Sequence, residues 1–426
     1  MTSATLPETS PVRLRSPRDV LAAVPYLLGY RPAECVVVAG VAPDGRLPLL
    51  ARAALDDLAH PDDGERVVRT LASRTADVGV DRSVVAVWSA RGVEPGTPLR
   101  RGVDRLVDAL DAVADVDPWL VTPHGYRGLD CDDPTCCPPE GHPLDQLAAG
   151  EVSAAFVLSG RAVARTQAEA FRIARAPDAS RALAGRAASR WERAGERARA
   201  GGAKARWRSE GLAAWDEARR HAATELRVDG SAGVAAGGVR LPPALLGRIG
   251  AALADTTVRD AVLLTLVPGA EQAAHRTAGG ASADEVGAAT ADAVARVVDP
   301  RVAVLPDEDV VGPARAVLEA VVAHVARRHQ APALTLLALL AWWRGDGGLA
   351  AHRVQAALAL DPGHRLAVLV RSVLTAGLPP GWVRRAAARA RGAAPSDRPS
   401  DGPSDELGEA RGDRSAVPPT REPGVG

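Results

Sequence analysis

Several amino acids are scarce in this chain of 426 residues. It has no asparagine, two isoleucines, two phenylalanines (Phe156 and Phe171) and, among 52 basic residues, a single lysine, Lys204. Amino acids with AT-rich codons are nearly missing, so the composition indicates a high-GC genome, and the abundance of arginine says little about function. Acidic and basic residues are equal in number, so a formal net charge of zero provides no global attraction to nucleic acid or to an anionic membrane.

Long hydrophobic runs are also missing. The longest strongly apolar run, Ala331–Trp343, is shorter than the roughly 20 residues that span a bilayer. The N-terminus, MTSATLPETSPVRLRSPRDV, lacks the basic and then apolar pattern of a signal peptide. Three clustered cysteines and a distant Cys35 are not typical of a disulfide framework in so long a chain. We therefore expect a cytoplasmic protein with no membrane-spanning segment.

Residues 16–160 alternate between helix and strand signals. Ser16-Pro17 is typical of a helix start and Gly29 of a helix end. The runs Cys35–Ala39 and Ser83–Trp88 indicate buried strands. Strands that alternate with amphipathic helices predict an α/β domain with a mixed, partly parallel sheet and flanking helices.

Two further signals place the most reactive segment of this domain. Asp44-Gly45 predicts a hairpin turn, after which residues 47–55 alternate with period two. Trp119–Thr122 reads as a further short strand, and a Cys-rich loop at 129–144 follows it. In open α/β sheets, sites usually form in loops at the carboxyl ends of the strands.

The rest of the chain is predicted to be mainly helical. A Gly/Ala-rich stretch at 275–285 predicts a loop, and the Pro/Ser/Asp/Gly-rich tail lacks the apolar content to fold. The expected regions are a flexible N-terminus (1–15), the α/β domain (16–160), an Arg-rich, mainly helical middle region (161–300), a tetratricopeptide-like helical region (301–392) and a disordered tail (393–426).

The tetratricopeptide-like signal depends on the spacing of Leu334, Ala338, Ala350, Ala357 and Pro362. Small residues allow two antiparallel helices to approach closely, and the proline ends the second helix. One repeat is legible, whereas about three are needed for an independent solenoid. The segment is therefore either a groove for a protein or peptide partner or an all-α bundle that covers the α/β domain.

The middle region is basic, with sixteen basic against eight acidic residues between 161 and 227. Trp191, Trp207 and Trp215 are interleaved, and exposed tryptophans beside arginines can stack on bases. Opposite charges at helical spacing, such as Arg193 and Glu196, favour instead a solvated helix face with the tryptophans in the core. We favour the second interpretation and expect no nucleic-acid partner.

The loop LDCDDPTCCPPEGHPL, residues 129–144, concentrates reactive side chains more than any other stretch. It contains Cys131, Cys136 and Cys137, which are three of the four cysteines, together with His142. Three sulfurs and one nitrogen are a donor set for tetrahedral zinc. The spacing C-x4-C-C-x4-H is, however, not that of a standard zinc finger or ribbon.

Two other interpretations of the loop stay open. Cys136 could form a redox pair with Cys131 or with Cys137. Alternatively, the thiols pack against the sheet as small apolar groups in a proline-stiffened loop, which we favour narrowly. Acidic neighbours attract a cation, and they raise the pKa of nearby thiols, which disfavours a nucleophilic thiolate. These neighbours are Asp130, Asp132 and Asp133.

Five segments together are similar to one known family. They are SPRDVLAAVPYLLGYRPAECVVV, WLVTPHGYRGLD, the CCPPEG core, VRD at Val258–Asp260 and AWWRGDGGLAAHRVQAALALDPGHRLAVLV. Over most of residues 14–385 the chain resembles domain-of-unknown-function family 4192 (DUF4192), which occurs in high-GC actinobacteria. The resemblance implies no activity, and no catalytic residue is carried over from it.

Two hypotheses about function follow. The first, which we favour, is a non-enzymatic binding or scaffold protein that engages a protein or peptide partner through its helical C-terminal half. The second is a small-molecule enzyme, or a metal or redox protein, with its site at the Cys131/Cys136/Cys137 loop and zinc as the candidate metal. The sequence has no Walker loop, HExxH or GxSxG motif, so whether the chain is an enzyme stays open.

Overall fold

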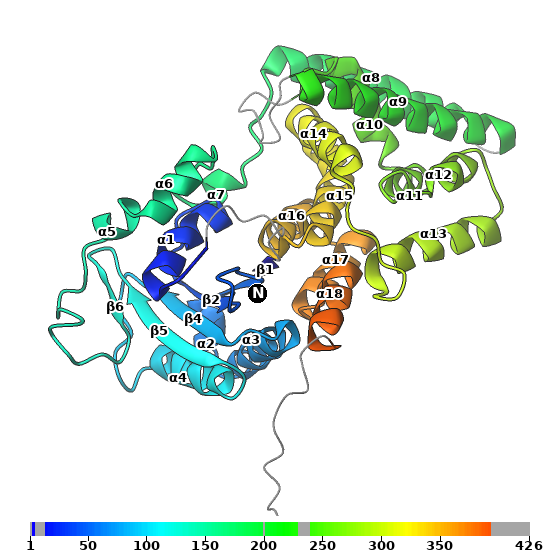
Figure 1. Ribbon diagram of the computed structural model, residues 1–426. Coiled ribbons are helices and arrows are strands. Elements are labelled where there is room, and N and C mark those ends of the chain that lie inside the picture. The colour runs from blue at the N-terminus through cyan, green and yellow to red at the C-terminus, as the bar shows by residue number, and fades with distance from the viewer. Residues whose placement is uncertain (1, 5–12, 199–200, 229–238, 393–426) are drawn as a thin grey trace, which may run out of the picture. The chain divides into compact units, whose positions relative to one another are not determined.

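The computed structural model describes residues 2–4, 13–198, 201–228 and 239–392. The tail 393–426 and residues 5–12 of the predicted flexible N-terminus lie outside these residues. Within them, an α/β layer comes first in the chain and helices make up the rest, as the sequence predicts (Figure 1). No helix in this part of the chain combines the length and the apolar character that a membrane crossing requires.

A mixed sheet forms the centre of the α/β layer, with the strand order β1-β3-β2-β4-β5-β6 (Figure 1). The β4–β5 pair is parallel and the other neighbouring pairs are antiparallel, so the predicted mixed, partly parallel sheet is confirmed. β1 lies in the segment predicted to be flexible. Its pairing with β3 uses backbone groups, which the polar composition does not reveal. The strands are β1 (Thr2–Ala4), β2 (Cys35–Val41), β3 (Leu49–Ala54), β4 (Arg82–Trp88), β5 (Asp115–Val121) and β6 (Tyr126–Gly128).

Helices cover both faces of this sheet. Successive residues of β2 pack on opposite faces of the sheet. Val37 belongs to one hydrophobic cluster with Leu21 and Phe156, and Val38 belongs to a second cluster with Leu106. A strand buried on both faces must be apolar throughout, which explains the continuous run in the sequence. The helices are α1 (Pro17–Leu28) and α6 (Glu151–Leu158) on one face, and α2 (Leu55–Ala59), α3 (Gly64–Val78) and α4 (Pro98–Asp111) on the other.

The limits of α1 are encoded locally, as predicted. Ser16 Oγ accepts a hydrogen bond from the Asp19 amide at 3.2 Å, and the Asp19 carboxylate accepts one from the Ser16 amide at 3.0 Å. This reciprocal capping box satisfies amides that have no partner within the helix. Gly29 ends the helix with a φ of 76°, a conformation that favours glycine, and places Tyr30 at the start of the next segment.

The Cys-rich loop begins after β6, not directly after the strand that contains Trp119. The hairpin at Asp44-Gly45 is present, and Gly45 has a φ of 78°. β6 was not predicted because three residues are too few to show a strand period. The Thr122 amide donates to the Gly125 carbonyl at 2.8 Å, and this turn brings the loop back along β5.

The middle region is helical, and its tryptophans are core residues. The rings of Trp191 and Trp207 stack with their centroids 5.0 Å apart, and Trp215 donates through Nε1 to Thr265 Oγ1 at 3.0 Å. All three rings are buried, which agrees with the interpretation of a solvated helix face above a tryptophan core. The helices are α5 (Asp145–Ala148), α7 (Gln167–Ala170), α8 (Asp178–Arg197), α9 (Gly201–Val228), α10 (Pro243–Ala252), α11 (Thr256–Leu264), α12 (Glu271–Ala278) and α13 (Ala283–Val298).

The loop predicted at 275–285 is wrong over most of its length. α12 continues to Ala278, and α13 already begins at Ala283. Ser282 and Glu285 form a capping box that starts α13, and alanine favours helix. Gly279 and Gly280 therefore mark a short break between two helices, not a long loop.

The C-terminal region continues the helical part (Figure 1). α15 and α16 pack closely at Ala338, Ala350 and Ala357, whose side chains are fully buried. Small residues thus permit the close approach that the spacing predicts, while the likeness to a tetratricopeptide repeat stays a prediction. The elements are α14 (Glu308–His324), η1 (Arg327–His329), α15 (Gln330–Trp343), α16 (Gly347–Leu360), α17 (Arg365–Thr375) and α18 (Gly381–Gly392).

Candidate functional site

The structure brings the three clustered cysteines together. The Sγ atoms of Cys131, Cys136 and Cys137 all lie within 4.8 Å of one another, in the loop between β6 and α5. Cys137 is buried, Cys131 is partly buried and Cys136 is exposed, so the cluster reaches from the sheet to the surface. Cys35, the remaining cysteine, is buried in β2 and is a separate free thiol.

The backbone of the loop explains why the sulfurs converge. The Asp133 carbonyl accepts hydrogen bonds from the amides of Cys136 at 3.1 Å and Cys137 at 2.7 Å, which closes a tight turn. The Gly128 amide donates to Cys137 Sγ at 3.3 Å. A Cβ on Gly128 would lie 3.0 Å from Cys131 Cβ, so a residue without a side chain is needed where the loop crosses β6.

His142 does not join the thiol cluster. Its Nε2 lies 2.8 Å from the Cys136 carbonyl oxygen, and its ring lies against Tyr126 at a centroid distance of 5.2 Å. The predicted acidic neighbours also have other partners or are exposed. Asp130 forms an ion pair with Arg100 at 2.5 Å, and Asp132 is exposed. The Asp133 carboxylate accepts hydrogen bonds from the amide and the hydroxyl of Thr135.

The two neighbouring sulfurs disfavour ionisation of Cys136. Hydrogen bonding to Cys131, followed by that to Cys137, raises the pKa of the Cys136 thiol to about 11. A thiolate here would lie beside two further sulfurs without a neighbouring cation. At neutral pH the exposed thiol is therefore a poor nucleophile, and the cause is the neighbouring sulfurs, not the aspartates named in the sequence analysis.

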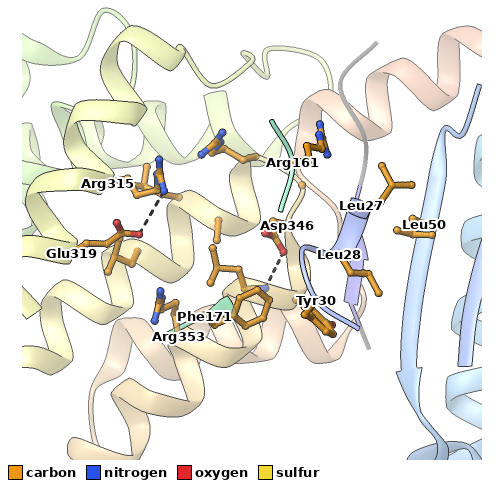
Figure 2. A pocket seen from close by; sticks show the side chains of 17 residues that line it. Leu27, Leu28, Tyr30, Leu50, Arg161, Phe171, Arg315, Glu319, Asp346 and Arg353 are labelled. Atoms are coloured by element: carbon orange, nitrogen blue, oxygen red, sulfur yellow. Dashed lines mark hydrogen bonds and ion pairs between the residues drawn. The ribbon is translucent and has the colours of Figure 1, made fainter. Parts of the chain in front are cut away.

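A second site, not found from the sequence, is a cavity of about 380 Å³ between the α/β layer and the C-terminal helices (Figure 2). Figure 2 shows Leu27, Leu28 and Leu50 of the α/β layer on one side and Arg315, Glu319 and Arg353 on the other. Ligand pockets are commonly about 300 to 1,000 Å³ in volume, so this cavity is in the range for a small molecule.

Two aromatic rings form part of the wall. Tyr30 and Phe171 meet edge to face with their centroids 5.5 Å apart, and Phe171 also lies 5.4 Å from the His352 ring of α16. The Tyr30 hydroxyl accepts a hydrogen bond from Gln167 Nε2 at 3.2 Å. Burial, partly offset by Arg52, raises the Tyr30 pKa to about 12, so its hydroxyl keeps its proton at neutral pH.

The segment that carries Phe171 is attached to both parts of the structure. The Ala164 amide donates to the Gly29 carbonyl at 2.9 Å, and the Arg31 amide donates to the Ala164 carbonyl at 3.0 Å. Beyond Phe171, the Ala176 amide donates to the Ala323 carbonyl of α14 at 3.0 Å. The cavity wall is therefore tied to the α/β layer by one end of this segment and to the helical region by the other.

Arg353 is the most unusual group in the cavity. Its side chain is buried, with the residue 6% exposed, yet it has no hydrogen bond or ion pair with another residue that the structure describes. Burial lowers the pKa of this guanidinium, and the carboxylates of Glu319 and Asp346 oppose that shift only through space. A guanidinium that faces a cavity from a mostly buried side chain, without an ion-pair partner among the described residues, is expected where a ligand of opposite charge is accommodated.

The two carboxylates at the cavity are engaged elsewhere. Glu319 lies 3.7 Å from Arg315 Nη1, one turn away on α14. Asp346 caps α16 by accepting a hydrogen bond from the Leu349 amide at 2.9 Å. Arg161 and Arg344 also line the cavity, and Arg344 is paired with Glu308 at 3.0 Å. Once the pairs of Arg344 and Arg315 are set aside, Arg161 and Arg353 face the single carboxylate of Asp346, so a small positive excess remains.

Sequence analysis missed this cavity because its residues come from distant segments. Leu27 and Arg353 are separated by most of the chain, and no local spacing connects them. The sequence contains one usable signal, since Phe171 is one of only two phenylalanines and lies in an otherwise polar stretch. That signal shows burial but not the partner against which the ring is buried.

Comparison with known proteins gives a family match. The family model described as "Domain of unknown function (DUF4192)" matches residues 17–381, which is most of the chain. No curated protein matches the chain, and no solved structure matches it.

Proposed function

Because this chain belongs to the DUF4192 family, whose description states no activity, we propose a function from the geometry: it binds a small ligand in the arginine-lined cavity. The ligand has one anionic group, a carboxylate or a phosphate, and an apolar body. This proposal keeps the hypothesis of a non-enzymatic binding protein and assigns part of its site to the helical C-terminal half.

The single observation that carries the proposal is the guanidinium of Arg353, which lines the cavity on a mostly buried side chain and has no hydrogen bond or ion pair with another described residue. An anion that reaches this group forms a charge-assisted hydrogen bond in a site of low dielectric constant. Arginine presents several N–H donors in a planar fork, which matches both carboxylate and phosphate oxygens. Arg315, whose Nε is buried without a hydrogen-bond partner among the described residues, is a second donor on the same side.

The remaining surface of the cavity suits an apolar body. Leucine side chains line it from both parts of the structure, and Phe171 and Tyr30 provide ring surface. Burying a ligand's hydrocarbon against these groups contributes roughly 25 cal/mol per Å² of apolar area removed from water. Recognition therefore combines one charged contact with a larger hydrophobic contact.

Binding is favoured over catalysis by the state of the titratable groups. Asp346 caps a helix, Glu319 pairs with Arg315, and Tyr30 has a pKa of about 12. A general acid or base works best when its pKa lies near the operating pH. Tyr30 does not meet that requirement, and Asp346 and Glu319 are each held in a structural contact.

A protein or peptide partner on the helical half remains part of the proposal. A shallow groove between α16 and α17 is lined by Val354, Leu358 and Leu374, with Arg371 at its side. This groove is distinct from the cavity and would be the surface that such a partner contacts. We also propose a cytoplasmic location in an actinobacterium, which the composition and the family resemblance support.

The experiment compares matched anions and neutral molecules on the full chain. The probes are octanoate against octanamide, 3-phenylpropanoate against 3-phenylpropanamide, and phenyl phosphate against phenol, with thermal stabilisation and titration calorimetry as readouts. A bound anion at about 100 times its Kd is expected to stabilise the protein by about 2.7 kcal/mol, and its neutral match by much less. If no anion binds more tightly than its neutral match, the proposal is contradicted.

A further inference from the structure

We infer that Cys131, Cys136 and Cys137 form a zinc site in which three thiolates bind the metal and the fourth position is open to solvent. The structure brings the three Sγ atoms within 4.8 Å of one another on a loop of only a few residues. This site is separate from the cavity, and it goes beyond the proposed ligand-binding function.

The spacing of the sulfurs is close to that of a zinc–thiolate site. A zinc–sulfur bond of about 2.3 Å in tetrahedral geometry places neighbouring sulfurs about 3.8 Å apart. The Sγ atoms now lie at most 4.8 Å apart, so side-chain movements of roughly 1 Å would bring them to the spacing of a zinc site. Cys136 is exposed and free to make such a movement, whereas the buried Cys137 is fixed by its surroundings.

The loop already provides a hydrogen bond of the kind that supports a metal-bound sulfur. The Gly128 amide donates to Cys137 Sγ at 3.3 Å, and this contact stabilises negative charge on that sulfur. Hydrogen bonds to metal ligands orient them and tune their affinity for the metal. A thiol that only packs against the sheet requires no such donor.

Metal binding also accounts for the protons and the charge of the cluster, because the cation compensates the negative charge of the three thiolates. Each cysteine gives up the proton of its thiol to solvent as its sulfur bonds to Zn²⁺, and no electron is transferred. Asp132 and Asp133 of the same loop carry negative charge that attracts the cation, whereas Asp130 is already paired with Arg100. A disulfide would instead join only two of the three sulfurs and would require an oxidant.

The fourth ligand does not come from His142 in this arrangement. Its Nε2 is 2.8 Å from the Cys136 carbonyl oxygen, so the imidazole holds the backbone of the loop. We therefore assign the fourth position to water on the exposed side of Cys136. Sites with three protein ligands and an open position are the kind in which zinc binds an exchangeable ligand.

The test is the zinc content of the untagged full-length protein, purified under reducing conditions and dialysed, by elemental mass spectrometry. About one zinc per chain is expected, with loss to less than about a tenth in Cys136→Ser and Cys131→Ser. Cys35→Ala is the matched control, because it removes the one cysteine outside the cluster and should keep its zinc. Circular dichroism checks that each variant is folded, and Cys136→Ser is the more informative variant because its side chain is exposed.

A second readout identifies the ligands. Cobalt replaces zinc in the reduced protein, and the near-ultraviolet charge-transfer absorption from sulfur to cobalt should be kept in Cys35→Ala and lost together with the metal in Cys131→Ser and Cys136→Ser. His142→Ala should leave about one zinc per chain. The inference is overturned if the reduced wild-type protein binds neither zinc nor cobalt, if two cysteines of the cluster are joined in a disulfide as purified, or if His142→Ala loses zinc as completely as Cys136→Ser.

Discussion

The rings of Tyr30 and Phe171 meet edge to face, with their centroids 5.5 Å apart, although the two residues belong to different segments of the chain. Tyr30 follows the C-terminal glycine of α1, and Phe171 follows α7 and reaches His352 on α16. This contact joins the α/β layer to the helical region at the wall of the cavity. Removing it should affect stability and binding together.

Phe171→Ala should destabilise the protein by about 3 to 5 kcal/mol, the usual cost of removing a buried phenylalanine ring. Tyr30→Phe keeps the ring contact and loses only the hydrogen bond from Gln167, so about 1 kcal/mol is expected. Urea unfolding of both variants measures the difference. Equal losses in the two variants would show that the ring contact does not hold the wall.

Two glycines in the same helix should respond in opposite directions to alanine. In α8, a Cβ on Gly195 would lie 2.7 Å from Trp207 Cζ2, whereas a Cβ on Gly185 meets nothing within 4 Å. Gly195→Ala should cost about 1 to 3 kcal/mol by overpacking, and Gly185→Ala should add about 0.5 to 1 kcal/mol through helix propensity. Thermal unfolding of the two variants tests this, and a stabilised Gly195→Ala would contradict the observed tryptophan packing.

His364 should contribute to loss of stability in acid. Its Nδ1 accepts from the Ala367 amide at 3.3 Å and so caps α17, which requires an unprotonated nitrogen. Burial lowers the pKa of this imidazole, Arg259 lowers it further, and Asp361 opposes the shift. Because the unfolded chain binds the proton more readily, stability should fall as the pH decreases through the unfolded value of about 6.5 towards the lower folded value.

The variant His364→Asn isolates this effect, because asparagine caps a helix without titrating. Free energies of unfolding at pH 7.5 and pH 5.5 should differ less in this variant than in the wild-type protein. The buried His329 also has a pKa lowered by burial, so part of the acid sensitivity should remain. An unchanged difference between the two pH values would exclude His364 from the acid response.

Gly128→Ala should weaken zinc binding without removing any ligand. The new Cβ would lie 3.0 Å from Cys131 Cβ and push that side chain away from the other two sulfurs. A fall of about 10-fold in zinc affinity is expected, as for other disturbances of groups that support metal ligands. Competition with a chelator measures it, with Gly185→Ala in α8, whose Cβ meets nothing within 4 Å, as the control for adding a methyl group to a glycine.

Local signals in the sequence predicted most of the fold. Ser16 and Asp19 start α1 by contacts within four residues, and the apolar run of β2 reflects burial on both faces of the sheet. β6 was missed because three residues show no period, and the end of α12 and the start of α13 were placed in a loop because the stretch 275–285 is rich in glycine and alanine. Local patterns fail where an element is short or where composition is uniform.

The two candidate sites differ in the same respect. The cysteines at 131, 136 and 137 are close in the sequence, so their clustering was visible before the fold was known, although the turn that positions them was not. The cavity depends on Tyr30, Phe171 and Arg353, which come together only when the α/β layer packs against the helical region. No periodicity in a single sequence encodes such a long-range contact.

The measurement that tests the central claim most directly is anion binding by Arg353→Met, compared with Arg365→Met on the exposed start of α17. The account predicts that Arg353→Met loses about 10- to 100-fold in affinity for the anion that binds best, for example 3-phenylpropanoate. It also predicts that the unliganded variant is as stable as the wild-type protein or more stable by about 1 kcal/mol, because an unpaired buried charge is gone. Unchanged anion binding, or an unliganded variant that is strongly destabilised, would contradict the assignment of Arg353 as the ligand's partner.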